Sequence, residues 1–322
     1  MANPKIGVAL PVREMSMMKP SDAAGTVIEL AKQVEELGFD SVWVGDSFVT
    51  RPRLEPLSLL GAIAMVTRNV TVGTAALTAV LREPKSLAHG ITTLDQLADG
   101  RLVMGLGMGE PLPVNNESDA VTMSYTERIT RVDEAITAFK KVWRGEKGDL
   151  QGRYYNLDEL RQQGPPKTPG GPGIWLASNG KPKAIRRTGT MYDGWMPVHI
   201  DPEWYGRALG SIRETATSAG RNPDDVVPSL YINVNTNPDG ASAEMALNEY
   251  TTRYYQLPVT TMSNYQNYFG GTDKELAARL GEYVDNGCRH IVLRLNTFTD
   301  YDRLLRSIGE NVVPAIHSIE ID

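Results

Sequence analysis

The feature that most constrains the fold is an alternation of short apolar segments with longer helical ones, repeated eight times along the chain. Strands that alternate with helices in this way run parallel, because each helix returns the chain to the same edge of the sheet. The expected strands are short and rich in β-branched and other apolar residues: 6–10, 41–44, 70–76, 101–106, 174–177, 194–198, 227–234 and 290–295.

The expected helices follow these strands in turn. They cover residues 21–37, 56–66, 84–97, 125–143, 182–187, 202–219, 241–250 and 273–286, and the last begins at Tyr301. Eight strand–helix pairs fit either a doubly wound sheet or a closed barrel. No linker-like segment divides the 322 residues. The sequence therefore favours one domain over residues 1–322, a (β/α)₈ TIM barrel.

Two stretches interrupt the alternation and are expected as insertions. Residues 144–173 are rich in Gly and Pro, and residues 251–271 are rich in Tyr, Gln, Asn and Thr. Long connections inside a compact domain are usually lids or binding loops. A solvated excursion or a contact in a dimer is the alternative interpretation.

Charge and composition exclude several classes of protein. The net charge of −6 argues against a nucleic-acid partner or an anionic membrane, although a local cluster of cations and N–H groups can still hold a small anion. One cysteine, Cys288, rules out an intrachain disulfide and fits a reducing compartment. The four histidines lack metal-ligand spacing, so no metal site is expected. Without an export signal or a spanning apolar run, we expect a cytoplasmic protein.

The candidate site follows from the barrel. Ligands of parallel barrels bind where the strands end, so the residues after each expected strand matter most. The segment 177–180 joins small and polar residues (Ala-Ser-Asn-Gly) to a helix that carries Lys183 and Arg187. Small residues and free N–H groups at a helix start form an anion site, which predicts a phosphate cradle. The alternative is an ordinary turn that caps the helix. The glycines at 105, 107 and 109 lack the full spacing of a dinucleotide fingerprint.

Several segments together carry a family resemblance. Residues 38–46, 92–102, 152–155, 193–195 and 268–272 resemble, in order, the signatures of luciferase-like flavin enzymes. The match spans nearly the whole chain. The resemblance implies a (β/α)₈ barrel, usually a homodimer, with the tricyclic ring of the cofactor at the strand ends.

The superfamily divides by cofactor, into enzymes that use FMN and enzymes that use the deazaflavin coenzyme F-420. Residues 107–110, followed by Asn115 and Asn116, are similar to a segment of F-420-dependent sugar-phosphate dehydrogenases. Residues 73–78 look like the strand-three loop of that branch, which contains a non-prolyl cis peptide. The resemblance therefore implies F-420 as the cofactor, with FMN as the alternative, and a cis bond at Ala75–Ala76 or beside it.

The same resemblance and the phosphate cradle give the residues a set of expected roles. Glu110 is the expected acid/base, with Ser47 a possible hydrogen-bond partner, and His199 lies in the expected substrate loop. The expected cofactor contacts come from the strand ends: Asp46, Thr74, Ala75, Ala76, Thr78, Met108, Gly109, Asn115, Ala177, Ser178, Asn179, Gly180, Lys183 and Arg187. The alternative interpretations, without a catalytic or binding role, are that Asp46 only caps its turn and that Glu110 is a solvated side chain.

The chain also departs from the sugar-phosphate dehydrogenases. Ser47 stands where a proton-donating histidine is common, and residues 197–200 lack the lysine that binds the sugar phosphate. A phosphorylated sugar is therefore not the expected substrate. The favoured function is hydride transfer between C5 of the deazaflavin and a small organic substrate. The alternatives are an FMN-dependent monooxygenase and a non-catalytic deazaflavin-binding protein.

Overall fold

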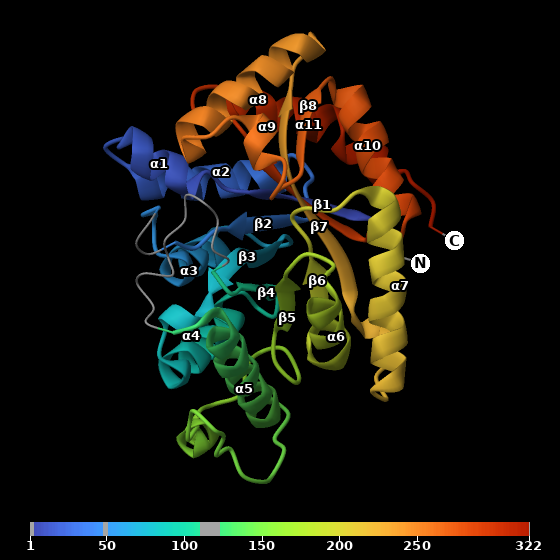
Figure 1. The fold of residues 1–322 in the computed structure, drawn as a ribbon. Coiled ribbons are helices and arrows are strands. Elements are labelled where there is room, and N and C mark those ends of the chain that lie inside the picture. The colour runs from blue at the N-terminus through green and yellow to red at the C-terminus, as the bar shows by residue number, and fades with distance from the viewer. Residues whose placement is uncertain (1–2, 48–50, 110–122, 322) are drawn as a thin grey trace.

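The computed structural model describes residues 3–47, 51–109 and 123–321, and it forms a closed barrel of parallel strands surrounded by helices (Figure 1). Each strand pairs in parallel with the next, and two pairings close the ring, β6 with β7 at Gly194–Val227 and β9 with β1 along its full length. The TIM barrel predicted from the alternation is confirmed. The eight barrel strands are β1 (Lys5–Ala9), β2 (Ser41–Val44), β3 (Thr71–Thr78), β4 (Leu102–Gly107), β5 (Gly173–Ala177), β6 (Gly194–Met196), β7 (Val227–Thr236) and β9 (His290–Leu295).

The surrounding helices begin where the sequence places caps. Glu55, Glu83 and Asp201 each precede a proline, and each carboxylate accepts a hydrogen bond from the N–H three residues later. A carboxylate cap followed by proline satisfies the first free N–H groups and presets the helical φ. The helices are α2 (Ala23–Glu36), α3 (Pro56–Val66), α4 (Pro84–Leu97), α5 (Tyr125–Trp143), α6 (Pro182–Met191), α7 (Pro202–Ser218), α10 (Asp273–Asp285), α11 (Tyr301–Asn311) and α12 (Val313–His317).

The floor of the barrel is closed by aromatic side chains. Trp43 and Trp175 are buried, with ring centroids 5.3 Å apart, and His290 meets both rings edge-on. Trp195 instead stacks on Tyr205 between the sheet and α7. The three tryptophans are therefore packing residues.

A short hydrogen-bond chain fixes the charge of this floor. Trp43 Nε1 donates to Ser41 Oγ at 2.8 Å, and Ser41 Oγ lies 2.7 Å from His290 Nε2. Because the indole can only donate, the serine hydroxyl accepts from it, and the same hydroxyl is hydrogen-bonded to the His290 ring. Burial lowers the pKa of His290 to about 3, so the ring is neutral at physiological pH.

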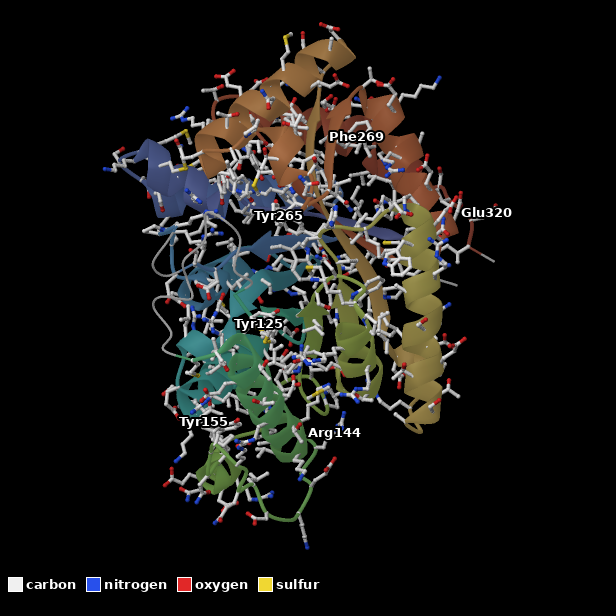
Figure 2. All side chains as sticks on the ribbon, viewed as in Figure 1. Tyr125, Arg144, Tyr155, Tyr265, Phe269 and Glu320 are labelled. Atoms are coloured by element: carbon white, nitrogen blue, oxygen red, sulfur yellow. The ribbon has the colours of Figure 1, made fainter. Side chains whose placement is uncertain are left out.

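Residues 251–271 are more regular than the sequence predicted. Helix α8 (Gly240–Tyr255) continues past the expected end at Tyr250, and α9 (Val259–Met262) and β8 (Tyr268–Gly271) follow, with β8 parallel to β7. The helix continues because Tyr254 and Tyr255 are buried against the barrel rather than solvated. Tyr265 and Phe269 mark this segment in Figure 2. Figure 1 shows α8 and α9 at the top of the view, at the opposite end from α5.

Two further differences from the prediction concern α1 and residues 144–173. Helix α1 (Val12–Met18) directly follows β1, and the sequence pattern missed it because it has only seven residues and no side-chain cap. The 144–173 stretch holds a short 3₁₀ helix (Asp158–Gln162) and packs onto α5, where the Glu134 carboxylate accepts hydrogen bonds from three successive backbone N–H groups. This insertion is thus a folded part of the barrel wall.

Candidate active site

A pocket of about 200 Å³ opens at the ends of the barrel strands. Seven of the residues predicted from the sequence line it: Asp46, Ser47, Ala75, Ala76, Thr78, Gly109 and Ala177. The remaining lining residues were not predicted: Arg51, Arg53, Met196, Val198, Tyr231, Tyr254, Tyr255, Gln266 and Arg294. None of the 144–173 insertion lines it, whereas the second insertion contributes Tyr254, Tyr255 and Gln266.

One wall of the pocket is built from small residues. The Ala75–Ala76 peptide is cis, as predicted, and both residues face the pocket. A Cβ on Gly107 would lie 3.4 Å from the Cβ of Ala76, and Gly109 has a φ of +65°, which favours glycine. A wall without long side chains lets a flat ring approach the backbone closely. Thr74, by contrast, is fully buried and donates its hydroxyl to the Gly105 carbonyl, away from the pocket.

Asp46 ties the ends of β2 and β3 together. Its Oδ2 accepts a hydrogen bond from the Thr78 N–H at 3.0 Å. The same oxygen forms an ion pair with Arg82 at 2.7 Å, and Arg82 forms a second ion pair with Glu55. Ser47 is 8% exposed, and its Oγ accepts a hydrogen bond from the Arg51 N–H. Both residues therefore hold the shape of the rim while lining the pocket.

The predicted phosphate cradle, residues 178–180, lies between β5 and α6. The Oγ of Ser178 and the Oδ1 of Asn179 are buried and have no hydrogen-bond partner within the described part of the chain. Trp195 Nε1 donates to the Ser178 carbonyl at 2.8 Å and fixes the turn. A Cβ on Gly180 would lie 3.1 Å from Ala208 and Trp204, so the turn packs tightly. Buried polar groups are normally paired. The Ser178 hydroxyl can donate to an oxyanion such as a cofactor phosphate at this helix start, whereas Asn179 Oδ1 only accepts and therefore calls for a donor.

Several predicted residues are not brought into the pocket lining. Arg187 forms a two-point ion pair with Asp133 at 2.6 and 2.8 Å, so its charge is used inside the protein shell. Lys183 and His199 are exposed, and Met108 is buried in the main core cluster. The ligand contacts predicted for these four residues stay predictions. Two further predicted residues, Glu110 and Asn115, lie outside the described residues.

The pocket also carries an unexpected concentration of arginine. Arg51, Arg53 and Arg294 line it, and Arg13 lies behind them on the Tyr254 ring; these four are here called the arginine cluster. Arg294 pairs with the Glu14 carboxylate at 2.8 Å, and the Tyr250 hydroxyl contacts both groups. Burial raises the pKa of Glu14, but the charge of Arg294 and these hydrogen bonds outweigh it, so the net direction is down. Glu14 is therefore ionised at neutral pH.

Aromatic rings support the arginine cluster. Arg13 and Arg294 lie 4.1 and 4.0 Å from the ring centroid of Tyr254, and Arg51 lies 4.6 Å from that of Tyr255. Stacking on aromatic faces orients a guanidinium and leaves its N–H edge available. Burial lowers the pKa of Arg13 and of Arg51, and the neighbouring arginines lower both further. For the Tyr254 hydroxyl, burial raises the pKa, but the surrounding arginines outweigh it and the net direction is down.

The sequence held weak signals of this wall. Arg51-Pro-Arg53 follows the second expected strand within seven residues, at the edge where ligands bind. Arg294 interrupts the apolar run of β9. An arginine inside a buried strand signals either an ion pair or a ligand.

Comparison with known proteins identifies the family. The family model for luciferase-like monooxygenases matches residues 4–294. The chain belongs to this family. Among curated luciferase-like relatives, the F-420-dependent glucose-6-phosphate dehydrogenase of Microbacterium testaceum is 29% identical over 90% of this chain and 93% of its own length.

Solved luciferase-like structures confirm the fold. A structure of monooxygenase RslO1 from Streptomyces bottropensis superposes with a TM-score of 0.81 at 24% identity, covering 96% of this chain and 99% of the other. An F-420-dependent secondary alcohol dehydrogenase, solved with an F-420–acetone adduct, gives 0.80 at 22% identity, covering 98% and 99%. These structural similarities establish the barrel fold of this chain. They do not identify its cofactor.

Within residues 3–47, 51–109 and 123–321, no three His, Cys, Asp or Glu side chains come together as metal ligands would. Over the same residues, no helix combines the length and the apolar character needed to span a bilayer.

Proposed function

We propose that this protein is a coenzyme F-420-dependent oxidoreductase that transfers a hydride between C5 of the deazaflavin and a carbon of a small organic substrate. The observation that carries the proposal is the buried Ser178 hydroxyl, which has no partner among the described residues, at the start of α6 and next in the chain to Ala177 of the pocket wall. Curated relatives that match over nine-tenths of the chain are F-420-dependent dehydrogenases, which supports this cofactor over FMN.

The chain supplies binding and orientation. The cradle would hold the phosphate, and the cis Ala75–Ala76 wall would face the ring. When bound, the cofactor would supply the hydride chemistry itself. Asp46, held by Arg82 and Thr78, keeps the two strand ends at a fixed separation, so the binding surface is preformed. We assign proton transfer to Glu110 on the strength of the family resemblance, with Ser47 on the pocket wall as its hydrogen-bond partner.

Glucose 6-phosphate, the substrate in the names of the relatives, is not proposed as the substrate of this chain. Residues 197–200 read Pro-Val-His-Ile and offer no lysine after β6, and His199 is exposed. We therefore propose the reaction type for this chain, and we do not propose a sugar phosphate as its substrate.

The deciding experiment compares the two cofactors on one protein preparation. Titration of the purified protein with F-420 and with FMN, followed by cofactor fluorescence, is expected to give the lower Kd for F-420. Equal or tighter binding of FMN would replace the proposal with the FMN-dependent monooxygenase. A panel of carbonyl and alkene compounds is then tested with reduced F-420 by cofactor absorbance. Tight binding without turnover on the panel would favour a non-catalytic deazaflavin-binding protein.

We also propose a cytoplasmic homodimer. Met65, Val66 and Leu97 are exposed by 57%, 39% and 44% at the C-terminal ends of α3 and α4, which pack against each other. Adjacent exposed apolar side chains favour association with a second copy. Light scattering is expected to give about twice the chain mass, and Met65→Lys is expected to shift it towards the monomer. The single cysteine is buried and fits a reducing compartment.

A further inference from the structure

We propose that Trp204, in the first turn of helix α7, is a phosphate-binding residue whose indole N–H donates a hydrogen bond to the phosphate that the cradle holds. This inference rests on the proposed function for the cradle itself. It adds a second helix to the site, because residues 178–180 belong to the turn before α6.

Trp204 differs from the other tryptophans of the chain in its exposure. The chain contains five tryptophans. Four of them are packing residues that are at most 8% exposed: Trp43, Trp143, Trp175 and Trp195. Trp204 is 45% exposed. A single exposed apolar side chain is common on protein surfaces, so the contacts of the indole decide what Trp204 does.

The polar edge of the Trp204 indole lies against the cradle. A Cβ on Gly180 would lie 3.1 Å from Trp204 Nε1, so this nitrogen contacts the turn. An indole nitrogen can only donate a hydrogen bond, and no acceptor for it is found within residues 3–47, 51–109 and 123–321. The Ser178 hydroxyl, two residues before Gly180, is buried and also has no partner in those ranges. The turn therefore brings together two groups that can donate to one oxyanion.

The packing of α6 against α7 holds this donor in place. Strands β5 and β6 are parallel neighbours, so the two helices begin at the same end of the barrel and lie side by side (Figure 1). A Cβ on Gly189 would lie 2.8 Å from the Ile212 carbonyl oxygen, so the helices approach closely. The Asp201 carboxylate accepts a hydrogen bond from the backbone N–H of Trp204 at 2.9 Å and fixes the first turn of α7. The donor is thus preformed, which lowers the entropy cost of binding.

The charges around the turn also favour an oxyanion. Three exposed cations at the start of α6 form no ion pair within the described part of the chain: Lys181, Lys183 and Arg186. Two carboxylates lie on the α7 side. Asp201 is hydrogen-bonded to the helix start, and Glu203 lies 3.6 Å from Arg207. Cations and free N–H groups at a helix start attract a phosphate.

The first test uses the exposure of Trp204 as its own signal, in cofactor-free, full-length protein with inorganic phosphate as the probe. Acrylamide is a neutral quencher that reaches exposed indoles, so Trp204→Phe is expected to remove most of the quenching of tryptophan emission. At constant ionic strength, phosphate is expected to protect the wild type from quenching. Ser178→Ala is expected to need more phosphate for the same protection. Absence of protection in the wild type would overturn the proposal, and so would equal protection in Ser178→Ala.

The second test measures the Kd of F-420 by cofactor fluorescence. Trp204→Phe keeps an aromatic ring and removes the N–H, so Kd is expected to rise about tenfold, as for one lost charge-assisted hydrogen bond. Trp204→His restores a ring N–H and is expected to bind F-420 more tightly than Trp204→Phe does. Trp143→Phe is the matched control. The Trp143 indole donates to Thr92 Oγ1 at 3.2 Å inside the core, so its loss is expected to leave the F-420 affinity unchanged.

Thermal unfolding separates binding from folding. Trp204→Phe is expected to unfold at the wild-type temperature, because its N–H has no acceptor among the described residues, whereas Trp143→Phe is expected to unfold at a lower temperature. Lower stability of Trp204→Phe with unchanged F-420 affinity would make the indole a packing residue of the turn and overturn the proposal. Failure of the proposed function would appear separately, as tighter binding of FMN than of F-420 by the wild type. Because FMN also carries a phosphate, Trp204→Phe would then still be expected to weaken FMN binding.

Discussion

The two sides of the pocket are built on different principles. The cradle side uses backbone and small residues: a cis peptide, glycines, and a serine and an asparagine at the start of α6. The arginine side uses long side chains that reach in from separate elements and rest on the Tyr254 and Tyr255 rings. A backbone surface suits a group that is the same in every turnover, and a side-chain surface can be altered one residue at a time. In the proposed function, the first side is the one that would hold the cofactor.

The largest expected effect concerns the residue that supplies the proton. Glu110→Gln keeps the side-chain shape and removes its titration, so turnover with F-420 is expected to fall by about 10²–10⁴-fold, the usual contribution of a positioned acid or base. F-420 affinity is expected to change little. Tyr254→Phe is the matched variant on the arginine side and is expected to retain most of the turnover. If Tyr254→Phe is the damaged variant instead, the proton comes from the arginine side.

The next effect tests the internal support of the arginine side. Glu14→Gln leaves Arg294 buried without its counter-charge and is expected to lower the free energy of unfolding by about 3–5 kcal/mol. Because the folded-state pKa of Glu14 is lowered, its stabilisation is present at neutral pH and is lost as pH falls below the usual glutamate range. Glu29→Gln breaks an exposed pair with Lys32 and is the control, with an expected change under about 1 kcal/mol. Urea unfolding measures both, and similar values would refute the distinction.

His290, in the barrel floor and on neither side of the pocket, is expected to make the free energy of unfolding depend on pH. His290 has a folded-state pKa of about 3, which is below its pKa in the unfolded chain. Its contribution to stability is therefore fully present above the unfolded-state pKa and is lost as pH falls below that value. Between pH 7.5 and 5 the free energy of unfolding is expected to fall by about 2 kcal/mol through this residue. His290→Gln is expected to flatten the pH dependence in that window. An unchanged slope in the variant would show that another group titrates there.

The smallest expected effect sharpens the cradle assignment. Ser178→Ala removes a buried hydroxyl that has no partner among the described residues, so the cofactor-free protein is expected to be as stable as the wild type or slightly more stable. F-420 affinity is expected to fall about tenfold, because the phosphate loses a charge-assisted hydrogen bond. Ser218→Ala, at the exposed end of α7, is the control. Lower stability with unchanged F-420 affinity would make Ser178 a structural residue.

The sequence led to a candidate cradle and gave no comparable prediction for the arginine side, and the reason is chain distance. Ala177 to Gly180 are consecutive, so their small size and the helix after them are visible in one short segment. Glu14 and Arg294 are 280 residues apart and meet only in the closed barrel. Each arginine alone is only a weak signal in the sequence.

The fold shows the same contrast between long and short periodic signals. Every barrel strand and its main helix were predicted, since eight repeats reinforce one another. Helix α1 and strand β8 were missed, because seven and four residues carry too little pattern. The end of α8 was placed too early because Tyr254 and Tyr255 look like loop composition, and their burial against the barrel decides the outcome.

The tyrosines of α8 have a consequence for how such a protein diversifies. Helix α8 lies between β7 and β8, outside the segments that form the cradle, so its substitutions leave the cofactor surface intact. A library restricted to positions 51, 53, 254 and 255 would sample new substrates in a protein that keeps its redox partner. The two surfaces can therefore evolve separately. Related proteins can differ in the substrate that they bind and still bind the same coenzyme.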